Sequence, residues 1–217
     1  LFKNEGRNLI PLKSAYVLEE HSKKIVQDIV TTVNKTREAA GFASKVFHLG
    51  SLYSLTVNTI PSVISGLKLR RGDLDIQLSL SSNLDLVKKL KATELDAIIV
   101  ALNETTSGQE FEHLPMFEDD IFLAVNKDSK YVGCDEIDLS QLKDETFLTL
   151  KKGFATRNDS DFVFEKAGIN PKVFLQVSDI FTLISMVSSG VGLALLPGRI
   201  STIYESSVKL IRLKAQY

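Results

Sequence analysis

The first pattern of apolar positions covers about residues 14–41. Apolar residues recur there at three-, four- and seven-residue steps, and neither Pro nor Gly interrupts the stretch before its end. This period predicts one long helix. Its narrow apolar stripe favours pairing with a second chain, and packing on its own domain is the alternative. The stripe residues, and hence the candidate dimerisation residues, are Leu18, Ile25, Ile29 and Val33.

The second pattern begins at Val46, after a hinge at residues 41–44, where strand and helix signals start to alternate. Strands are expected at residues 46–50, 74–80, 95–101, 146–150, 172–177, 191–196 and 208–213, with helices at about 53–68, 83–92, 138–143, 157–167 and 179–189. Two extended segments, 110–116 and 120–125, join two such blocks. Strand-helix-strand units of this kind predict an α/β fold, and the two blocks predict two lobes with a cleft between them.

Four turns at expected helix starts carry small hydroxyl or amide residues. They are residues 50–54, 81–83, 153–157 and 178–179. Backbone N–H groups at a helix start are unpaired and carry the positive end of the helix dipole, so such turns can bind a small anion. Ordinary helix capping is the alternative at each of them. If all four face the cleft, the sequence predicts a binding site for a small carboxylate there.

The first twelve residues are expected to form the end of a helix, a basic glycine turn and a short strand. Lys3 and Arg7 are the candidates for contacting DNA phosphate, and a charged surface hairpin is the alternative. The formal net charge of -1, from 26 Lys+Arg and 27 Asp+Glu, leaves no general basic surface. That balance counts against DNA contact by this chain alone.

Signals for catalysis are weak. The three histidines, His21, His48 and His113, have no ligand spacing, and Cys134 has no histidine near it in sequence. The acidic run at residues 118–120 is typical of a solvated loop. We therefore expect no enzyme, no metal site and no cofactor. A single cysteine, no apolar run of membrane-spanning length and no secretory signal favour a cytoplasmic protein without a membrane partner.

Several motifs together resemble the LysR-type transcriptional regulators. Residues 6–12 are similar to the wing of the family's winged helix-turn-helix, and residues 93–100, 117–124 and 188–197 are similar to segments of its effector domain. The resemblance spans almost the whole chain. It implies a homodimeric or tetrameric DNA-binding regulator whose two-lobed domain resembles periplasmic binding proteins and takes a small inducer in its cleft.

The resemblance also implies a division of the chain. Residues 1–13 would be a remnant of the winged helix-turn-helix and residues 14–42 the linker and dimerisation helix. Residues 45–109 with 207–217 would form the first effector lobe, and residues 110–206 the second. The DNA-reading helix is expected before Leu1, and the last strand and helix of the first lobe after Tyr217.

Within the family, residues 50–56, 116–122, 153–156, 179–181 and 195–199 are most similar to regulators of malonate utilisation. Malonate is therefore the favoured small carboxylate, although Leu52 stands where many members have a hydroxyl residue. The candidate effector-binding residues are Ser51, Tyr53, Ser54, Ser82, Asn83, Phe154, Ala155, Thr156, Arg157, Ser178 and Asp179. The alternative is a solute-binding receptor for a transporter, which shares the fold, but the long striped helix argues against it.

Overall fold

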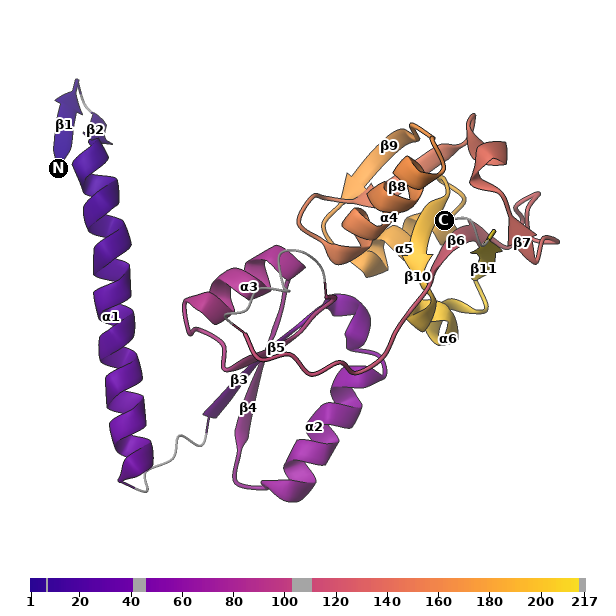
Figure 1. Cartoon of the computed structure of the whole chain (residues 1–217). Coiled ribbons are helices and arrows are strands. Elements are labelled where there is room, and N and C mark those ends of the chain that lie inside the picture. Colours follow the sequence, from indigo (N-terminus) through magenta and orange to yellow (C-terminus); the bar gives the residue numbers. More distant parts are fainter. Residues whose placement is uncertain (7, 41–45, 103–110, 215–217) are drawn as a thin grey trace.

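The computed structural model describes residues 1–6, 8–40, 46–102 and 111–214, without the side chains of residues 27, 30, 34, 35, 38, 39, 202 and 203. A hairpin and a long helix come first, followed by two lobes of mixed strands and helices (Figure 1). The predicted α/β class is confirmed.

The N-terminal residues form a hairpin, β1 (Phe2–Glu5) and β2 (Asn8–Pro11), paired antiparallel with Phe2 opposite Pro11. The expected helix end is therefore wrong, and the alternative of a surface hairpin holds. Lys3 lies on β1, where its Nζ is 3.1 Å from Glu5 Oε1. Arg7, the second candidate for phosphate contact, lies outside the described residues.

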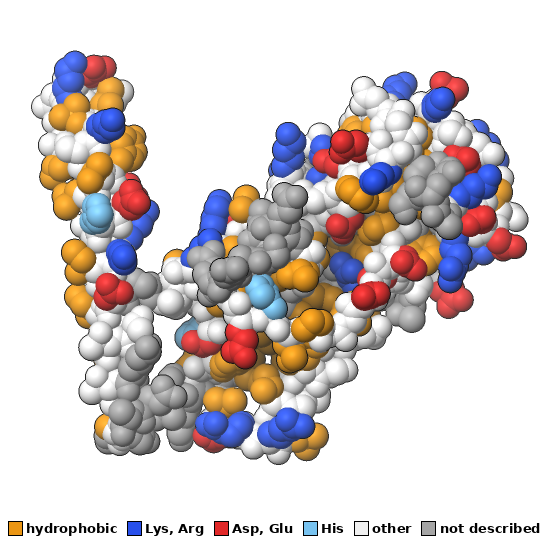
Figure 2. Space-filling model, in the orientation of Figure 1, with side chains coloured by type: hydrophobic (Ala, Val, Ile, Leu, Met, Phe, Trp, Pro, Cys, Tyr) orange, Lys and Arg blue, Asp and Glu red, His pale blue; other side chains and the backbone are white. Residues whose placement is uncertain are grey.

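The long helix is α1 (Lys13–Ala39), which agrees with the predicted span. Its stripe residues are turned to solvent: Ile25 is 60% exposed and Val33 is 43% exposed. Apolar side chains are visible along the α1 column, which stands beside the rest of the molecule (Figure 2). None of the residues that the structure describes therefore covers the apolar face of α1.

The first lobe is built on a parallel sheet with strand order β4-β3-β5. Its elements are β3 (Val46–Ser51), the 3₁₀ turn η1 (Tyr53–Leu55), α2 (Thr59–Arg70), β4 (Asp75–Leu80), α3 (Asn83–Lys91) and β5 (Ala97–Ile99). Gly50 lies on the central strand, where a Cβ would come within 2.6 Å of Leu95 and 2.8 Å of Leu86. A larger residue here would force the buried Leu86 and Leu95 side chains to shift.

The helix predicted at residues 53–68 is broken. A 3₁₀ turn covers Tyr53–Leu55, and α2 begins only at Thr59. Pro61 explains the break, because proline lacks an N–H and clashes with the carbonyl four residues earlier. It is tolerated in the first turn of α2 but not in the interior of a helix that began at Tyr53.

The second lobe has a four-stranded sheet, β10-β6-β11-β7, and a parallel pair, β8-β9. Its elements are β6 (Ile121–Asn126), β7 (Glu136–Ile137), η2 (Leu139–Leu142), β8 (Thr146–Leu150), α4 (Ala155–Lys166), β9 (Lys172–Val177), α5 (Ile180–Ser188), β10 (Ala194–Pro197), η3 (Gly198–Ile200), α6 (Ser201–Tyr204) and β11 (Val208–Leu213). A parallel bridge between Phe147 and Leu193 joins the two sets of strands.

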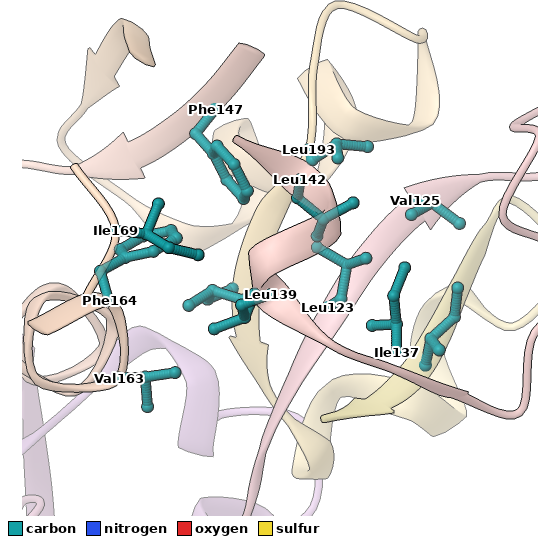
Figure 3. Packing of buried hydrophobic residues seen from close by; sticks show 12 residues of the cluster. Leu123, Val125, Ile137, Leu139, Leu142, Phe147, Val163, Phe164, Ile169 and Leu193 are labelled. Atoms are coloured by element: carbon teal, nitrogen blue, oxygen red, sulfur yellow. The ribbon is translucent and has the colours of Figure 1, made fainter. Parts of the chain in front are cut away.

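Both faces of this second sheet are buried. Leu123 and Val125 of β6 face a cluster that includes Phe147, Val163 and Phe164, shown in Figure 3. Ala124, between them in sequence, faces the opposite cluster, which contains the buried residues of α5. Alternation along a strand places neighbouring residues on opposite faces, so α4 with η2 covers one face and α5 covers the other.

Two details of the second lobe differ from the prediction. β11 pairs with β6, with Leu210 opposite Ala124, so residues 208–213 belong to the second lobe and their assignment to the first lobe is wrong. Residues 139–142 form a 3₁₀ turn and not an α-helix. The two-residue strand β7 and the short α6 carry too few residues to leave a periodic signal.

Candidate functional site

A small cavity lies between the two lobes. Its volume is about 20 Å³. One water molecule needs about 10–15 Å³ in this measure, so the space is close to that of a single water. The first lobe lines it with Leu52, Tyr53, Ser54 and Ser81, and the second lobe with Leu150, Phe154, Ala155, Thr156 and Ile180.

Two of the four predicted turns are capped by their own side chains. Ser82 Oγ accepts a hydrogen bond of 3.2 Å from the Asp85 N–H and donates one of 2.9 Å to Asp85 Oδ2. Asp179 Oδ1 accepts a 2.8 Å hydrogen bond from the N–H of Thr182, and its Oδ2 accepts one of 2.7 Å from the Thr182 hydroxyl. The side chains of Ser82 and Asp179 therefore stabilise the starts of α3 and α5.

Two further candidates make structural hydrogen bonds in the first lobe. Asn83 is 1% exposed and binds the backbone of Ala101 through both ends of its amide, at 2.9 and 3.2 Å. Ser51 is fully buried, and its hydroxyl donates to the carbonyl of Leu52 at 3.3 Å. Neither side chain lines the cavity.

The turn before α4 is different, because no side chain caps the helix. Phe154 is the N-cap residue and makes no side-chain capping bond. The preceding Gly153 has a φ of +98°, a left-handed conformation that favours glycine, and it brings the chain sharply into the helix. The start of α4, at Ala155 and Thr156, thereby comes to the wall of the cavity.

Thr156 is the most unusual side chain at this wall. It is 5% exposed, and in the described part of the chain its hydroxyl makes no hydrogen bond to another residue. Buried polar groups are rarely left without a partner. A hydroxyl in this position can donate to, or accept from, a molecule in the cavity.

Ser54 lies opposite, on η1, and is bound to a residue that the sequence analysis did not select. Arg199 donates to Ser54 Oγ from Nε at 3.1 Å and from Nη2 at 2.9 Å. The same guanidinium donates from Nη1 to Asp119 Oδ2 at 2.7 Å. Ser54 belongs to the first lobe and Arg199 to the second, so this network joins the lobes at the edge of the cavity.

A second carboxylate stands close to Arg199. Burial raises the pKa of Asp159 above the usual value of 3.8, Arg199 opposes the rise, and Asp119 adds to it. The side chains of Arg199 and Asp119 are themselves only 19% and 18% exposed. Residues 118–120 form an exposed loop, as predicted, although the Asp119 side chain is turned toward Arg199 and is itself only 18% exposed.

The remaining candidates lie away from the cavity lining. Arg157 Nε donates to both carboxylate oxygens of Asp161, at 2.8 and 2.7 Å, and Nη1 donates to the Leu150 carbonyl at 3.1 Å. Ser178 is exposed. The structure thus brings five predicted residues together at the cavity: Tyr53, Ser54, Phe154, Ala155 and Thr156.

The lobes also touch at other residues near the site. The Leu84 N–H, on α3, donates to the Gly153 carbonyl at 3.3 Å. Ala155 of the second lobe packs into the core cluster of the first lobe, and Tyr53 of the first lobe packs against a cluster of the second. Direct contacts between the lobes therefore flank the cavity.

Groups suited to metal binding are not found in the described ranges, where no three His, Cys, Asp or Glu residues come together. The surface pair of His48 and Asp96, with Nδ1 3.4 Å from Oδ2, is a two-residue contact. No helix among the described residues is both long enough and apolar enough to cross a bilayer.

Comparison with known proteins gives a consistent result. Residues 40–216 match the model of the LysR substrate binding domain. The chain is 40% identical over 218 residues to the malonate utilization transcriptional regulator of Klebsiella pneumoniae, covering 100% of this chain and 71% of that protein. It is 22% identical to the DNA-binding transcriptional dual regulator OxyR of Escherichia coli, over 91% of this chain and 64% of that protein.

Among solved structures, the fold resembles the effector binding domain of QuiR in complex with shikimate. The TM-score is 0.69 at 21% identity, over 78% of this chain and 81% of that one. The reduced form of OxyR gives a TM-score of 0.65 at 22% identity, over 78% and 79% of the two chains. These relatives are regulators of transcription and not enzymes or transport receptors, and the two-lobed, periplasmic-binding-protein-like fold is theirs. The chain belongs to the LysR family of transcriptional regulators, and residues 40–216 are its effector-binding domain.

Proposed function

We propose that this regulator senses a small carboxylate, malonate before others, in the cavity between its lobes and so controls transcription of a catabolic operon. The name of the Klebsiella pneumoniae relative supports the choice of malonate, because its 40% identity over the whole chain is well above the 22% identity to OxyR. The chemistry of the cavity supports an anion independently of that name.

The observation that carries the proposal is the buried hydroxyl of Thr156 at the uncapped start of α4. α4 spans 12 residues, so the positive end of its dipole and its free N–H groups lie at the cavity wall. The Ser54 hydroxyl accepts from Arg199 and has its own proton available to an acceptor. A carboxylate placed between them would receive hydrogen bonds from both lobes.

Ligand entry requires the lobes to move. Malonate is several times larger than water, and the present cavity of about 20 Å³ admits only a water-sized molecule. Opening between two rigid lobes is the usual motion of such domains. An anion that binds the opened geometry more tightly shifts the population toward it, and that shift is the signal passed to the DNA-binding part.

The same proposal covers assembly and DNA. The exposed stripe of α1 would pair with a second copy to form a homodimer, and two dimers would form a tetramer, in the cytoplasm. DNA would be bound by a winged helix-turn-helix that the residues of β1 and β2 complete, with Lys3 and Arg7 toward phosphate.

Thermal unfolding with and without ligand tests the effector. A ligand at a hundred times its Kd stabilises the folded state by about 2.7 kcal/mol, so malonate should raise the melting temperature and acetate should raise it less. The double variant Ser54→Ala/Thr156→Val should lose most of this rise. Ser62→Ala, which removes an exposed hydroxyl on α2, is the matched control and should keep it. Equal rises in the double variant and the unchanged chain would show that the ligand binds elsewhere.

A further inference from the structure

Arg199 is a cation at the edge of the proposed anion site. Its Nε and Nη2 atoms both reach Ser54 Oγ, an atom of a cavity-lining residue, at 3.1 and 2.9 Å. The side chain is 19% exposed, so water screens its charge only weakly. A partly buried guanidinium within one hydrogen bond of a cavity-lining residue is well placed to act on an anion there.

The edge that Arg199 offers is the one that suits a carboxylate. Nε–H and one Nη–H point in parallel and pair with the two oxygens of a carboxylate. In Arg199 both donors converge instead on the single oxygen of a neutral serine. Two N–H groups that share one neutral oxygen make weaker hydrogen bonds than two that each have a charged acceptor. A carboxylate in place of the serine oxygen would give each N–H its own oxygen and would carry the opposite charge.

A second arginine near the cavity, Arg157, can bind a ligand carboxylate through Nε only if it gives up a carboxylate that it already binds. Arg157 Nε is already bound by both oxygens of Asp161. A ligand carboxylate at Arg157 would only exchange one carboxylate for another. At Arg199 the same ligand would exchange a hydroxyl for a carboxylate, which is the more favourable step.

The rest of the network allows the exchange. Nη1 is held by Asp119 at 2.7 Å, and the Arg199 backbone N–H also donates to Asp119 Oδ2, at 3.3 Å, so the guanidinium keeps its place on the second lobe when Ser54 leaves. Gly198 permits this close approach, since a Cβ there would meet Asp119 at 3.0 Å and the Phe122 ring at 2.7 Å.

We propose that Arg199 is the charged anchor of the effector: its Nε/Nη2 edge binds a carboxylate that takes the place of Ser54 Oγ, while Ser54 turns its hydroxyl to donate to the same carboxylate. This inference rests on the proposed function. It also supplies the link between binding and movement. The Arg199–Ser54 contact joins the two lobes directly, and the ligand replaces it with a longer bridge from Arg199 through the carboxylate to Ser54.

Isothermal titration calorimetry of the 217-residue chain with sodium malonate tests the anchor. Arg199→Gln should raise the malonate Kd at least tenfold, because a hydrogen-bonded charge pair is lost. Arg199→Lys keeps the charge without the paired donors and should weaken binding by a smaller factor. Arg157→Gln should change Kd less than Arg199→Gln does. Arg71→Gln removes an exposed arginine paired with Asp73 at 3.2 Å and should leave Kd unchanged.

Each result decides a separate question. Binding of malonate by the unchanged chain and by Arg199→Gln within threefold of each other would overturn the anchor and leave the proposed function intact. Tighter binding by Arg199→Gln would also overturn it, since Arg199 would then oppose entry. If neither malonate nor acetate binds the unchanged chain, the proposed effector class is wrong and the anchor falls with it. Should Arg199→Gln fail to fold, the Lys variant carries the same test.

Discussion

Two helices, α1 and α5, have the same kind of apolar stripe, but the stripe of α5 is buried and that of α1 is exposed. On α5, the apolar residues Ile180, Leu183, Ile184 and Val187 are all buried, at 3% exposure or less. On α1, residues at similar spacing are 43% to 60% exposed, and Ile25 is the most exposed of the stripe. Both stripes follow the period of an amphipathic helix.

The difference teaches what periodicity can and cannot decide. The spacing of apolar residues tells which face of a helix avoids water, but not which molecule covers it. For α5 the cover lies in the same lobe, where strands β6, β8 and β10 contribute to the cluster around it. For α1 no part of the described chain covers the stripe, so a second chain is the cover that we propose.

Replacing one isoleucine on each helix should give the largest contrast. Ile184 is fully buried, and Ile184→Ala should lower the free energy of unfolding by about 2–5 kcal/mol, because it leaves a cavity in the cluster under α5. Ile25→Ala should change the unfolding of the two-lobed part by no more than about 0.5 kcal/mol. Urea unfolding followed by circular dichroism measures both.

The order of the two effects should reverse when self-association is measured, with Ile25→Ala having the larger effect and Ile184→Ala the smaller. In sedimentation velocity, Ile25→Ala should reduce the dimer fraction, whereas Ile184→Ala, at a temperature where it is folded, should leave that fraction unchanged. If Ile25→Ala destabilised the lobes as strongly as Ile184→Ala, the stripe of α1 would have to pack on its own domain. That was the alternative in the sequence analysis.

The sequence predicted most of the fold because local patterns determine it. β8 and β9 were found to the residue, since each is a short apolar run between polar turns. β11 was found to the residue but placed in the wrong lobe. Its pairing with β6 is a long-range contact, and no local pattern specifies which sheet a strand joins.

The candidate site was predicted in part for a related reason. The turns at residues 50–54 and 153–157 are local features, and their chemistry is visible in sequence. Arg199 lies 145 residues from Ser54 and 80 from Asp119, and nothing in the sequence joins the three. Capping and binding also look alike in sequence, and only the hydrogen bonds separate the capped starts of α3 and α5 from the uncapped start of α4.

A smaller difference in stability is expected when one acidic side chain is removed from each of the helices α5 and α1. Asp179→Ala should destabilise the second lobe by about 0.5–2 kcal/mol, because the cap is lost from a helix of only nine residues. Asp179→Asn retains a side-chain oxygen and should cost less. Glu19, whose carboxylate is 2.6 Å from Lys23 Nζ on α1, is exposed, so Glu19→Ala should cost about 0.5 kcal/mol or less. Equal losses from Asp179→Ala and Glu19→Ala in thermal unfolding would contradict the capping role.

The smallest expected effect is on the pH dependence of stability. It compares two aspartates, Asp159 on α4, whose pKa burial raises, and Asp28 on α1, which is exposed. Burial raises the pKa of Asp159 in the folded chain, so the folded state holds this proton more tightly than the unfolded state does. Stability must then fall as pH rises from the usual value of 3.8 through the raised pKa, because ionising the buried group costs more than ionising it in the unfolded chain.

Asp159→Asn cannot ionise, so above this pH window the variant should melt at a higher temperature than the unchanged chain. The gap should close below pH 3.8, where both side chains are neutral. Asp28→Asn removes the same charge from an exposed position on α1, and its melting curves should overlay those of the unchanged chain. A lower melting temperature for Asp159→Asn at neutral pH would mean that the attraction between Asp159 and Arg199 outweighs the cost of burial. In that case Arg199 would face two ionised carboxylates, Asp119 and Asp159, and a ligand anion would have to compete with both.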